Sequence, residues 1–405
     1  MPLNERERRI VDEIALRAPA MLSDLAHIVA IPTGHGFHKG LDEMRAWMSL
    51  RLRALGAEIS RQSGGPRPDW LREPTVAGAD GCDVIIADRL GIESIGARIL
   101  LSGHLDTVHD PAGDFLELSA ECDGMRRGPG AADMKGGLIV ALTALECLHA
   151  LSIPVRWSFV CNADEESGSF SSAPHLQAIA KKHDVGLVLE PAAGEGKFVT
   201  ARSGSLQFRI DAFGRAAHAG RDAASGISAV AALCEAIGKV LAISDSAIGR
   251  TVNIGPLQGG QATNIVPDHA AAWGNARYRS EEQRQHIADA LAAIVVDHAD
   301  KLPRVTVRSI DNRPEKPETQ RVKALAEMAL GAAQDLHIAS GTTSTGGVSD
   351  ANILQAAGLP CLDGLGVRGG NLHRRDEFVV TASLAERATL LALLMSRLAS
   401  QRFVP

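Results

Sequence analysis

ARILLSGHLDT (97–107) is one of four apolar runs that are too short to form helices, and these runs decide the fold class. The others are DVIIADRL (83–90), VRWSFVCNADEE (155–166) and DVGLVLEP (184–191). A longer helical pattern, GGLIVALTALECLHAL (136–151), separates the second run from the third. Near-continuous apolar strands that alternate with helices are typical of parallel sheets buried on both faces. We therefore expect an α/β fold with a mainly parallel sheet covered by helices.

Helical and loop patterns surround these strands. Two helices are expected ahead of them, at residues 4–29 and 41–55, and the Gly- and Pro-rich stretch 60–82 is predicted to be loop. Two further helices, at 319–334 and 381–399, continue the pattern towards the end of the chain.

The pattern of apolar and polar residues changes at about residue 201. Strand and helix patterns follow in the order β-α-β-β-α-β, at 205–214, 226–243, 251–260, 269–280, 281–299 and 303–312. This is the ferredoxin-like order, and about 110 residues suffice for one domain. We therefore expect a main domain in two segments, 1–200 and 313–405, interrupted by an inserted ferredoxin-like α+β domain, 201–312.

The composition argues against several classes of protein. The 405 residues carry a formal charge of −6, with 45% hydrophobic and 22% charged residues, which is typical of a globular protein. The 14 aromatic residues (9 Phe, 4 Trp and 1 Tyr) and the lack of a basic stripe argue against a nucleic-acid partner. No signal-peptide core or membrane-length apolar window is found, so we expect a cytoplasmic protein. The six cysteines form no C-x-x-C pair, which gives no support to thiolate metal sites.

Acidic residues or histidines stand at the ends of three of the apolar runs. They are His104, Asp106, Asp164, Glu165, Glu166 and Glu190. Because ligands bind at the carboxyl ends of strands in open α/β sheets, these residues are candidates for one shared site. His104 and Asp106 point to the same face, where a carboxylate can orient a metal-bound histidine. Glu165 and Glu166 point in different directions, so that one can bind a metal while the other serves as a general base.

Two more residues complete a possible ligand set. Asp133 lies in the glycine-rich loop GPGAADMKGG, which matches neither the dinucleotide nor the P-loop fingerprint, and His373 lies in NLHRRDE. Each residue alone has an ordinary alternative: a structural histidine, a helix cap or a solvated acidic turn. Together they form an N/O ligand set that suits two Zn²⁺ ions, or Co²⁺ or Mn²⁺ as substitutes, with one bridging carboxylate. The set is His104, Asp133, Glu166, Glu190 and His373.

Eight ordered motifs resemble those of the dinuclear zinc exopeptidases and amidohydrolases, which include glutamate carboxypeptidase, aminoacylase, acetylornithine deacetylase and succinyl-diaminopimelate desuccinylase. The motifs are SGHLDTV (102–108), GPGAADMKGG (128–137), NADEESGS (162–169), LVLEP (187–191), HAG (218–220), GGQATNIVPDHA (259–270), GGVSDAN (346–352) and H-x-x-x-E (373–377). The likeness runs from the N-terminal helices to the C-terminus and is strongest to the glutamate carboxypeptidase branch.

The resemblance implies a role for each candidate ligand. Asp133 would bridge two zinc ions, His104 and Glu190 would complete one site, and Glu166 and His373 the other. It further implies that Asp106 orients His104, that Glu165 is the general base, and that the peptide bond after Asp133 is cis.

The resemblance also implies how substrate is bound. His218 resembles a family histidine that reaches into the partner subunit's site, which implies a homodimer formed through the inserted domain. Asn264, Arg277 and Gly347 fall at substrate-binding positions. The chain departs from the common family pattern at Ala217, Ala223 and Met134, where serine, proline and aspartate are frequent.

The function that follows is a zinc-dependent carboxypeptidase or amidohydrolase that cleaves the amide bond next to a C-terminal, glutamate-like amino acid. Its substrate would be a small N-acyl or N-aminoacyl amino acid, whose terminal carboxylate an arginine binds bidentately. Lys197 and Arg313 are candidates for a second carboxylate, with ordinary surface cations as the alternative. An N-acyl-amino-acid deacylase is the nearest alternative function, and a catalytically silent binding protein on the same fold is a more remote one.

Overall fold

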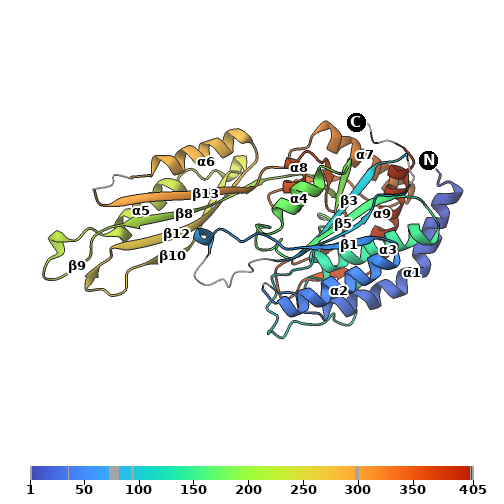
Figure 1. The fold of residues 1–405 in the computed structure, drawn as a ribbon, viewed down its shortest axis with the longest axis horizontal. Helices are drawn as coiled ribbons and strands as arrows, with labels where there is room; N and C mark the ends of the chain where they lie inside the picture. Colours follow the sequence, from blue (N-terminus) through green and yellow to red (C-terminus); the bar gives the residue numbers. More distant parts are fainter. Residues whose placement is uncertain are drawn as a thin grey trace.

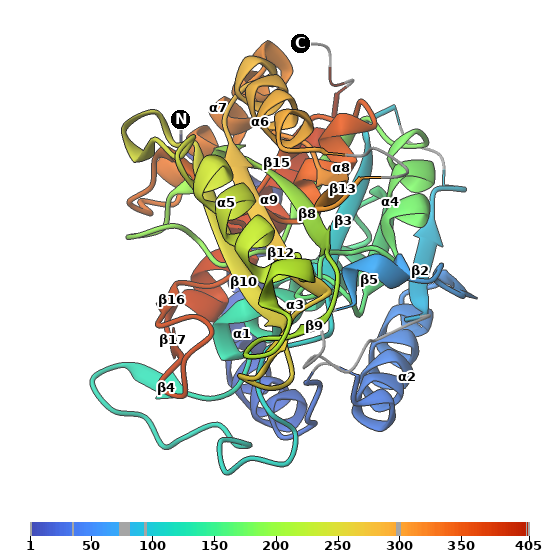
Figure 2. The same cartoon turned by 90° about the vertical axis from the view of Figure 1, so that its left-hand side faces the viewer.

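A computed structural model describes residues 2–34, 36–72, 82–92, 95–296, 301–401 and 403. The molecule is elongated: a larger part holds both ends of the chain, and a smaller part extends from it (Figure 1). Figure 2, turned by 90°, places helices of the smaller part in front of the larger one.

The larger part is built on a six-stranded sheet in the order β1-β2-β5-β3-β6-β15. The strands are β1 (Glu58–Gln62), β2 (Val84–Arg89), β3 (Arg98–His104), β5 (Arg156–Asn162), β6 (Val185–Val188) and β15 (Cys361–Leu362). Four of them, β5, β3, β6 and β15, run parallel, whereas β1 and β2 pair antiparallel at one edge. The expectation of a mainly parallel sheet is confirmed.

Helices cover both faces of this sheet. One apolar core contains side chains of α1 (Glu5–Val29), α2 (His38–Ala54), α3 (Gly137–Ala150), α7 (Gln320–Asp335) and α9 (Ser383–Ala399). A second core contains side chains of α4 (Ala173–Ala180) and α8 (Asp350–Ala356). Since alternate side chains of a strand face opposite ways, Ile99 and Leu101 of β3 enter the first core and Leu100 enters the second.

The prediction of loop for residues 60–82 is wrong at its beginning. Residues 60–62 belong to β1, an edge strand whose side chains are exposed or half-buried and which is held by backbone pairing with β2. Such a strand lacks the apolar alternation that marks strands in a sequence. Asp69–Leu71 form a 3₁₀ turn (η1), and residues 73–81 lie outside the described residues.

The smaller part, the four-stranded unit (residues 204–313), has an antiparallel sheet in the order β10-β12-β8-β13. Its main elements are β8 (Gly204–Phe213), α5 (Ala229–Leu241), β10 (Thr251–Gly259), β12 (His269–Tyr278), α6 (Glu281–Ala293) and β13 (Arg304–Arg313). This is the predicted β-α-β-β-α-β order, although α6 ends earlier than predicted. The unit has a core of its own, in which Phe208 and Ile210 lie with Leu233 and Leu291.

Two chain segments join the parts. The chain enters the four-stranded unit after β7 (Phe198–Arg202) and returns after β13. There the backbones of Arg202 and Lys316 exchange hydrogen bonds of 2.9 and 3.0 Å. The buried Lys316 Nζ also donates to the carbonyl oxygen of Thr200 at 2.8 Å. The two connecting segments are therefore hydrogen-bonded to each other where they join the two parts.

Several short strands complete the fold. β4 (Met125–Arg127), β16 (Gly369–Gly370) and β17 (Phe378–Val380) form a small sheet, and β14 (Thr342–Thr345) pairs with β7. β9 (Ala217–His218) pairs with β11 (Ile265–Val266) at the end of the four-stranded unit that lies away from the larger part (Figure 1). Within the described ranges, no helix has the length and apolar character needed to cross a membrane.

Candidate metal centre and substrate cavity

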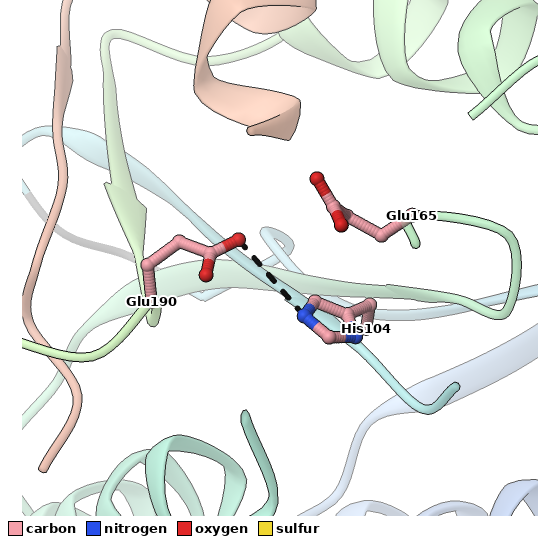
Figure 3. A group of neighbouring side chains, drawn as sticks. All are labelled: His104, Glu165 and Glu190. Atoms are coloured by element: carbon pink, nitrogen blue, oxygen red, sulfur yellow. Dashed lines mark ion pairs between the residues drawn. The ribbon is translucent and has the colours of Figure 1, made fainter. Parts of the chain in front are cut away.

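Three parallel strands deliver the first candidate residues to one place. His104 ends β3, Glu165 follows β5, and Glu190 follows β6. Their side chains converge, as Figure 3 shows, and His104 Nε2 lies 4.0 Å from Glu190 Oε1. One ligand atom from each lies within 4.8 Å of the others, and the same holds for His104, Asp133 and Glu166. The predicted clustering at the carboxyl ends of the strands is present.

Asp133 lies between the two histidines. Its Oδ1 is 3.2 Å from His104 Nε2, and its Oδ2 is 3.5 Å from His373 Nε2. His373 Nε2 is also 3.2 Å from Glu166 Oε2. The two oxygens of Asp133 thus face different candidate ligands, as a bridging carboxylate requires. The peptide bond from Asp133 to Met134 is cis, as expected.

The chemistry of the cluster fits bound cations. The carboxylates of Asp133 and Glu166 raise the pKa of His373 to about 10. Burial favours a lower pKa for His104, but the carboxylates of Asp106 and Asp133 outweigh it, so the pKa lies well above its ordinary value. Glu166 Oε1 is buried and has no hydrogen-bond partner in the described part of the chain. Two imidazoles and three carboxylates with an open oxygen match an N/O site for divalent ions.

Asp106 holds both His104 and the turn after β5. His104 Nδ1 donates to the backbone oxygen of Asp106 at 2.9 Å, which leaves Nε2 directed at the cluster. The Asp106 carboxylate accepts from the backbone N–H groups of Glu165 at 3.3 Å and Glu166 at 3.0 Å. The orienting role expected of Asp106 belongs to its carboxylate, whose Oδ1 lies 3.5 Å from His104 Nδ1, farther away than the backbone oxygen.

Glu377 is a functional candidate to which sequence reasoning gave no role. Its buried carboxylate accepts from the backbone N–H groups of Gly130 at 3.2 Å, Ala132 at 2.9 Å and Asp133 at 3.1 Å. Its Oε2 also lies 2.7 Å from His109 Nε2. Glu377 therefore fixes the backbone that carries the bridging candidate Asp133. Its place four residues after His373 was visible in the sequence, but its partners were not.

Glu165, the expected general base, is paired with Arg313. Arg313 Nη2 lies 2.7 Å from Glu165 Oε1 and donates to the backbone oxygen of Glu165 and to Ser169 Oγ, both at 2.7 Å. Burial raises the pKa of Glu165 to about 7, although the charge of Arg313 opposes this shift. Arg313 is buried, so its alternative interpretation as a surface cation is wrong. Lys197, by contrast, is exposed.

A cavity of about 530 Å³ opens beside the cluster. Its walls include Asp133, Glu165, Glu166, Glu190, Arg202, Arg277, Arg313, Gly347 and His373. Arg202 Nε lies 2.7 Å from Asp363 Oδ2, and Arg202 Nη1 donates to the carbonyl oxygen of Gly347 at 3.1 Å. Arg277 Nη1 is buried without a hydrogen-bond partner in the described part of the chain, so it is free to donate to a ligand.

His218 and Asn264 do not join this cavity. They lie together at the far end of the four-stranded unit, where Ala219 N donates to Asn264 O at 2.9 Å. Arg277 pairs with Ser205 at the near end of the same sheet and lies eight residue steps along β12 from His269. At about 3.4 Å per residue, this is roughly 27 Å. Within one subunit, Asn264 and Arg277, which are both expected at substrate-binding positions, therefore lie far apart.

Comparisons with known proteins agree with this geometry. Residues 100–397 match the model of the peptidase family M20/M25/M40. Carboxypeptidase G2 from Pseudomonas sp. (strain RS-16) is 28% identical, over 93% of this chain and 89% of that protein.

Solved structures share the fold. A tripeptidase from Staphylococcus aureus subsp. aureus Mu50 has a TM-score of 0.73 and 24% identity, over 95% of this chain and 99% of that one. The YXEP protein of Bacillus subtilis, a dinuclear metal-binding peptidase, has a TM-score of 0.63 and 15% identity, over 95% and 98%. With the family model matching well over half of its residues, this chain belongs to peptidase family M20/M25/M40 and is a metallo-hydrolase that acts on peptide or amide C–N bonds.

Proposed function

We propose that this protein is a zinc-dependent carboxypeptidase or amidohydrolase that removes a C-terminal, glutamate-like amino acid from a small N-acyl or N-aminoacyl substrate. The observation that carries the proposal is Arg277, whose buried Nη1 has no hydrogen-bond partner among the described residues and which lines the same cavity as the candidate ligands. A guanidinium is suited to a terminal carboxylate because its planar fork donates two parallel hydrogen bonds. The likeness to carboxypeptidase G2 supports the same choice.

The proposed ligand roles follow the geometry of the cluster. Asp133 would contact both ions, His104 and Glu190 would hold one, and Glu166 and His373 the other. Two bound divalent ions would polarise the amide carbonyl and lower the pKa of the attacking water.

Proton transfer and substrate binding are assigned to residues of the protein. The Glu165 carboxylate would take the proton of the attacking water and deliver it to the leaving amine nitrogen. Arg313 would hold this carboxylate in place through the 2.7 Å contact. Arg277 and Gly347 would bind the terminal carboxylate, so that the scissile amide lies beside the ions.

We further propose that the working unit is a homodimer formed through the inserted domain, 201–312. His218 and Asn264 are exposed and lie at the far end of the four-stranded unit, so within one subunit they are remote from the cluster. Entry of the far end of this unit into the partner's site would give His218 a catalytic role and Asn264 a substrate-binding role.

An N-acyl-amino-acid deacylase is the nearest alternative function, because it would use the same ions and the same arginine.

The test is hydrolysis of N-acyl glutamates that carry either a free or an amidated terminal carboxylate. The wild type with zinc should strongly prefer the free carboxylate, and a chelator should abolish the activity. Arg277→Ala should lose most of this preference, because a hydrogen bond to a charged group contributes about 1.5–3 kcal/mol. If Arg277→Ala discriminates as strongly as the wild type, Arg277 does not bind the carboxylate. If no acyl amino acid is cleaved with zinc present, the proposed function is wrong.

A further inference from the structure

A third arginine lines the cavity beside the candidate ligands, and the proposed function gives it no role. The described ionisable residues on the cavity walls are Asp133, Glu165, Glu166, Glu190, Arg202, Arg277, Arg313 and His373. The acidic residues and His373 are assigned to the ions and to proton transfer. Arg277 is assigned to the terminal carboxylate, and Arg313 holds Glu165. Arg202 is therefore the described cation on these walls that no step uses.

Asp363 holds the Arg202 guanidinium in a fixed orientation. It directly follows β15, the strand beside β6, and is fully buried. Its Oδ2 lies 2.7 Å from Arg202 Nε and accepts from Ser349 Oγ at 2.7 Å, and its Oδ1 accepts from the backbone N–H of Gly364 at 2.6 Å. The charge of Arg202 is thus balanced by a carboxylate that is not among the described residues lining the cavity.

The Arg202 guanidinium still has donors for a ligand. Its Nε donates to Asp363 and its Nη1 to the carbonyl oxygen of Gly347, whereas its Nη2 donates to no described residue. Because Arg202 lines the cavity, the Nη2 group and the second hydrogen of Nη1 can serve a bound molecule. Adjacent N–H groups of a guanidinium match the two oxygens of a carboxylate.

Arg202 lies next to the place proposed for the terminal carboxylate. That place is formed by Arg277 and Gly347, and a Cβ added at Gly347 would lie 3.6 Å from Arg202 Nη1. Along the chain, Arg202 is three residues before Ser205, whose backbone pairs with that of Arg277. The two arginines therefore border one cavity, as the two carboxylates of a small dicarboxylic amino acid require.

The two cations that the sequence suggested for a second carboxylate are less well placed. Lys197 is exposed and is not among the described residues that line the cavity. Arg313 lines the cavity, but its Nη2 is taken up by Glu165 and Ser169. Arg202 is left as the candidate that combines a cavity position with an available edge of the guanidinium.

We propose that Arg202 binds the side-chain carboxylate of the C-terminal amino acid and so selects glutamate over its neutral analogues. The inference rests on the proposed function and identifies the residue behind the glutamate preference. Arg277 and Arg202 then bind one carboxylate each, and Asp363 keeps Arg202 oriented. A neutral side chain would leave the Nη2 donors without an anionic acceptor once the substrate fills the cavity.

N-acetyl-glutamate, N-acetyl-glutamine and N-acetyl-norvaline test the inference. Their side chains have the same number of carbon atoms and end in a carboxylate, an amide and a methyl group. We expect the kcat/KM of the wild type to fall in that order, with at least about tenfold between glutamate and glutamine, equivalent to about 1.4 kcal/mol. The N-benzoyl series repeats the measurement with a second acyl group.

Three variants separate Arg202 from its partner. Arg202→Gln/Asp363→Asn removes both members of the ion pair, so no buried charge is left alone, and should cleave the glutamate and glutamine compounds about equally well. Asp363→Asn alone keeps the arginine and should keep most of the ratio. Arg202→Lys can keep a cation beside Asp363 but lacks the planar fork, so it should lose most of the ratio.

Lys197→Gln is the matched control, because it removes an exposed cation outside the described cavity lining, and its ratio should equal that of the wild type. An undiminished ratio in a folded Arg202 variant, a ratio lost in Lys197→Gln, or a wild type that cleaves the glutamine compound as well as the glutamate one overturns the inference and leaves the proposed function standing. Failure to cleave any acyl amino acid with zinc present overturns the proposed function and the inference with it.

Discussion

At the level of single residues, the candidate site depends on contacts between distant parts of the chain. Glu377 is the clearest case, because one carboxylate accepts three backbone N–H groups of the loop that carries Asp133. Supporting contacts of this kind commonly change metal affinity by 10–100-fold when they are removed.

Glu377→Gln tests this support. An amide keeps one oxygen to accept from Ala132 and Asp133, but its NH₂ group would face the N–H of Gly130, which leaves a buried donor unsatisfied. We expect zinc affinity, measured by competition with a chelator, to fall about 10–100-fold while the fold is kept. Glu386→Gln, on the half-exposed side chain that pairs with Arg368, should leave it unchanged. Equal zinc affinity in all three proteins would refute the role of Glu377.

At the level of elements, the junction of α3 with β6 positions two candidate ligands. A Cβ added at Gly137 would lie 2.2 Å from the carbonyl oxygen of Leu189, the residue before Glu190. Only glycine allows the start of α3 to approach the end of β6 this closely, and this approach brings Glu190 towards Asp133.

Two Gly→Ala substitutions distinguish the effect of this close packing on stability from the general effect of replacing a helical glycine by alanine. Gly137→Ala should destabilise the protein by more than about 1 kcal/mol, because backbone must shift, and should weaken zinc binding. Gly331→Ala in α7, where an added Cβ meets nothing within 4 Å, should stabilise it by about 0.4–1 kcal/mol. Urea unfolding measures both. Opposite signs are expected, and a neutral Gly137→Ala would show that the contact is unimportant.

At the level of the whole molecule, the four-stranded unit meets the larger part where Arg202 and Lys316 pair. Burial lowers the pKa of Lys316 to about 8, below its ordinary value of 10.5. Between these two values the unfolded chain binds more protons than the folded one, so stability rises with pH. The free-energy cost of burying the charged Lys316 ammonium is fully present below about pH 8 and is absent above about pH 10.5.

Lys316→Met removes this titration. The unfolding free energy of the wild type minus that of Lys316→Met should therefore rise between about pH 8 and pH 10.5. Lys323→Met, at a side chain that is 51% exposed on α7, is the control, and the rise for Lys316→Met should exceed any change that Lys323→Met gives over the same range. A flat difference for Lys316→Met would mean that Lys316 is not buried at the junction in solution.

The proposed homodimer with a shared active site is tested by mixing two inactive variants. His218→Ala and Glu165→Gln subunits should each be inactive alone, but mixed dimers have one site with both residues intact. Mixing should therefore restore part of the activity, up to about a quarter of the wild-type value per subunit if half of the dimers are mixed. Persistent inactivity after subunit exchange has been verified by mass spectrometry would count against a shared site.

Much of this organisation could be predicted from local sequence. Apolar runs and helical periodicity record which side of each element is buried, so β3, β5, β6 and α3 could be located before their partners were known. The polar residues at the strand ends could be grouped as well, because parallel strands place their carboxyl ends at one edge of the sheet. His104, Glu166 and Glu190 therefore form a recognisable set.

The rest depends on which distant segments meet, and only the tertiary structure decides that. The edge strand β1 is held by backbone pairing and has no apolar signature. The contact of Arg313 with Glu165 spans 148 residues, and that of Glu377 with Asp133 spans 244. The periodicity of apolar residues shows which face of an element is buried but not which distant segment packs against it. Contacts between distant residues can therefore be identified only in the folded structure.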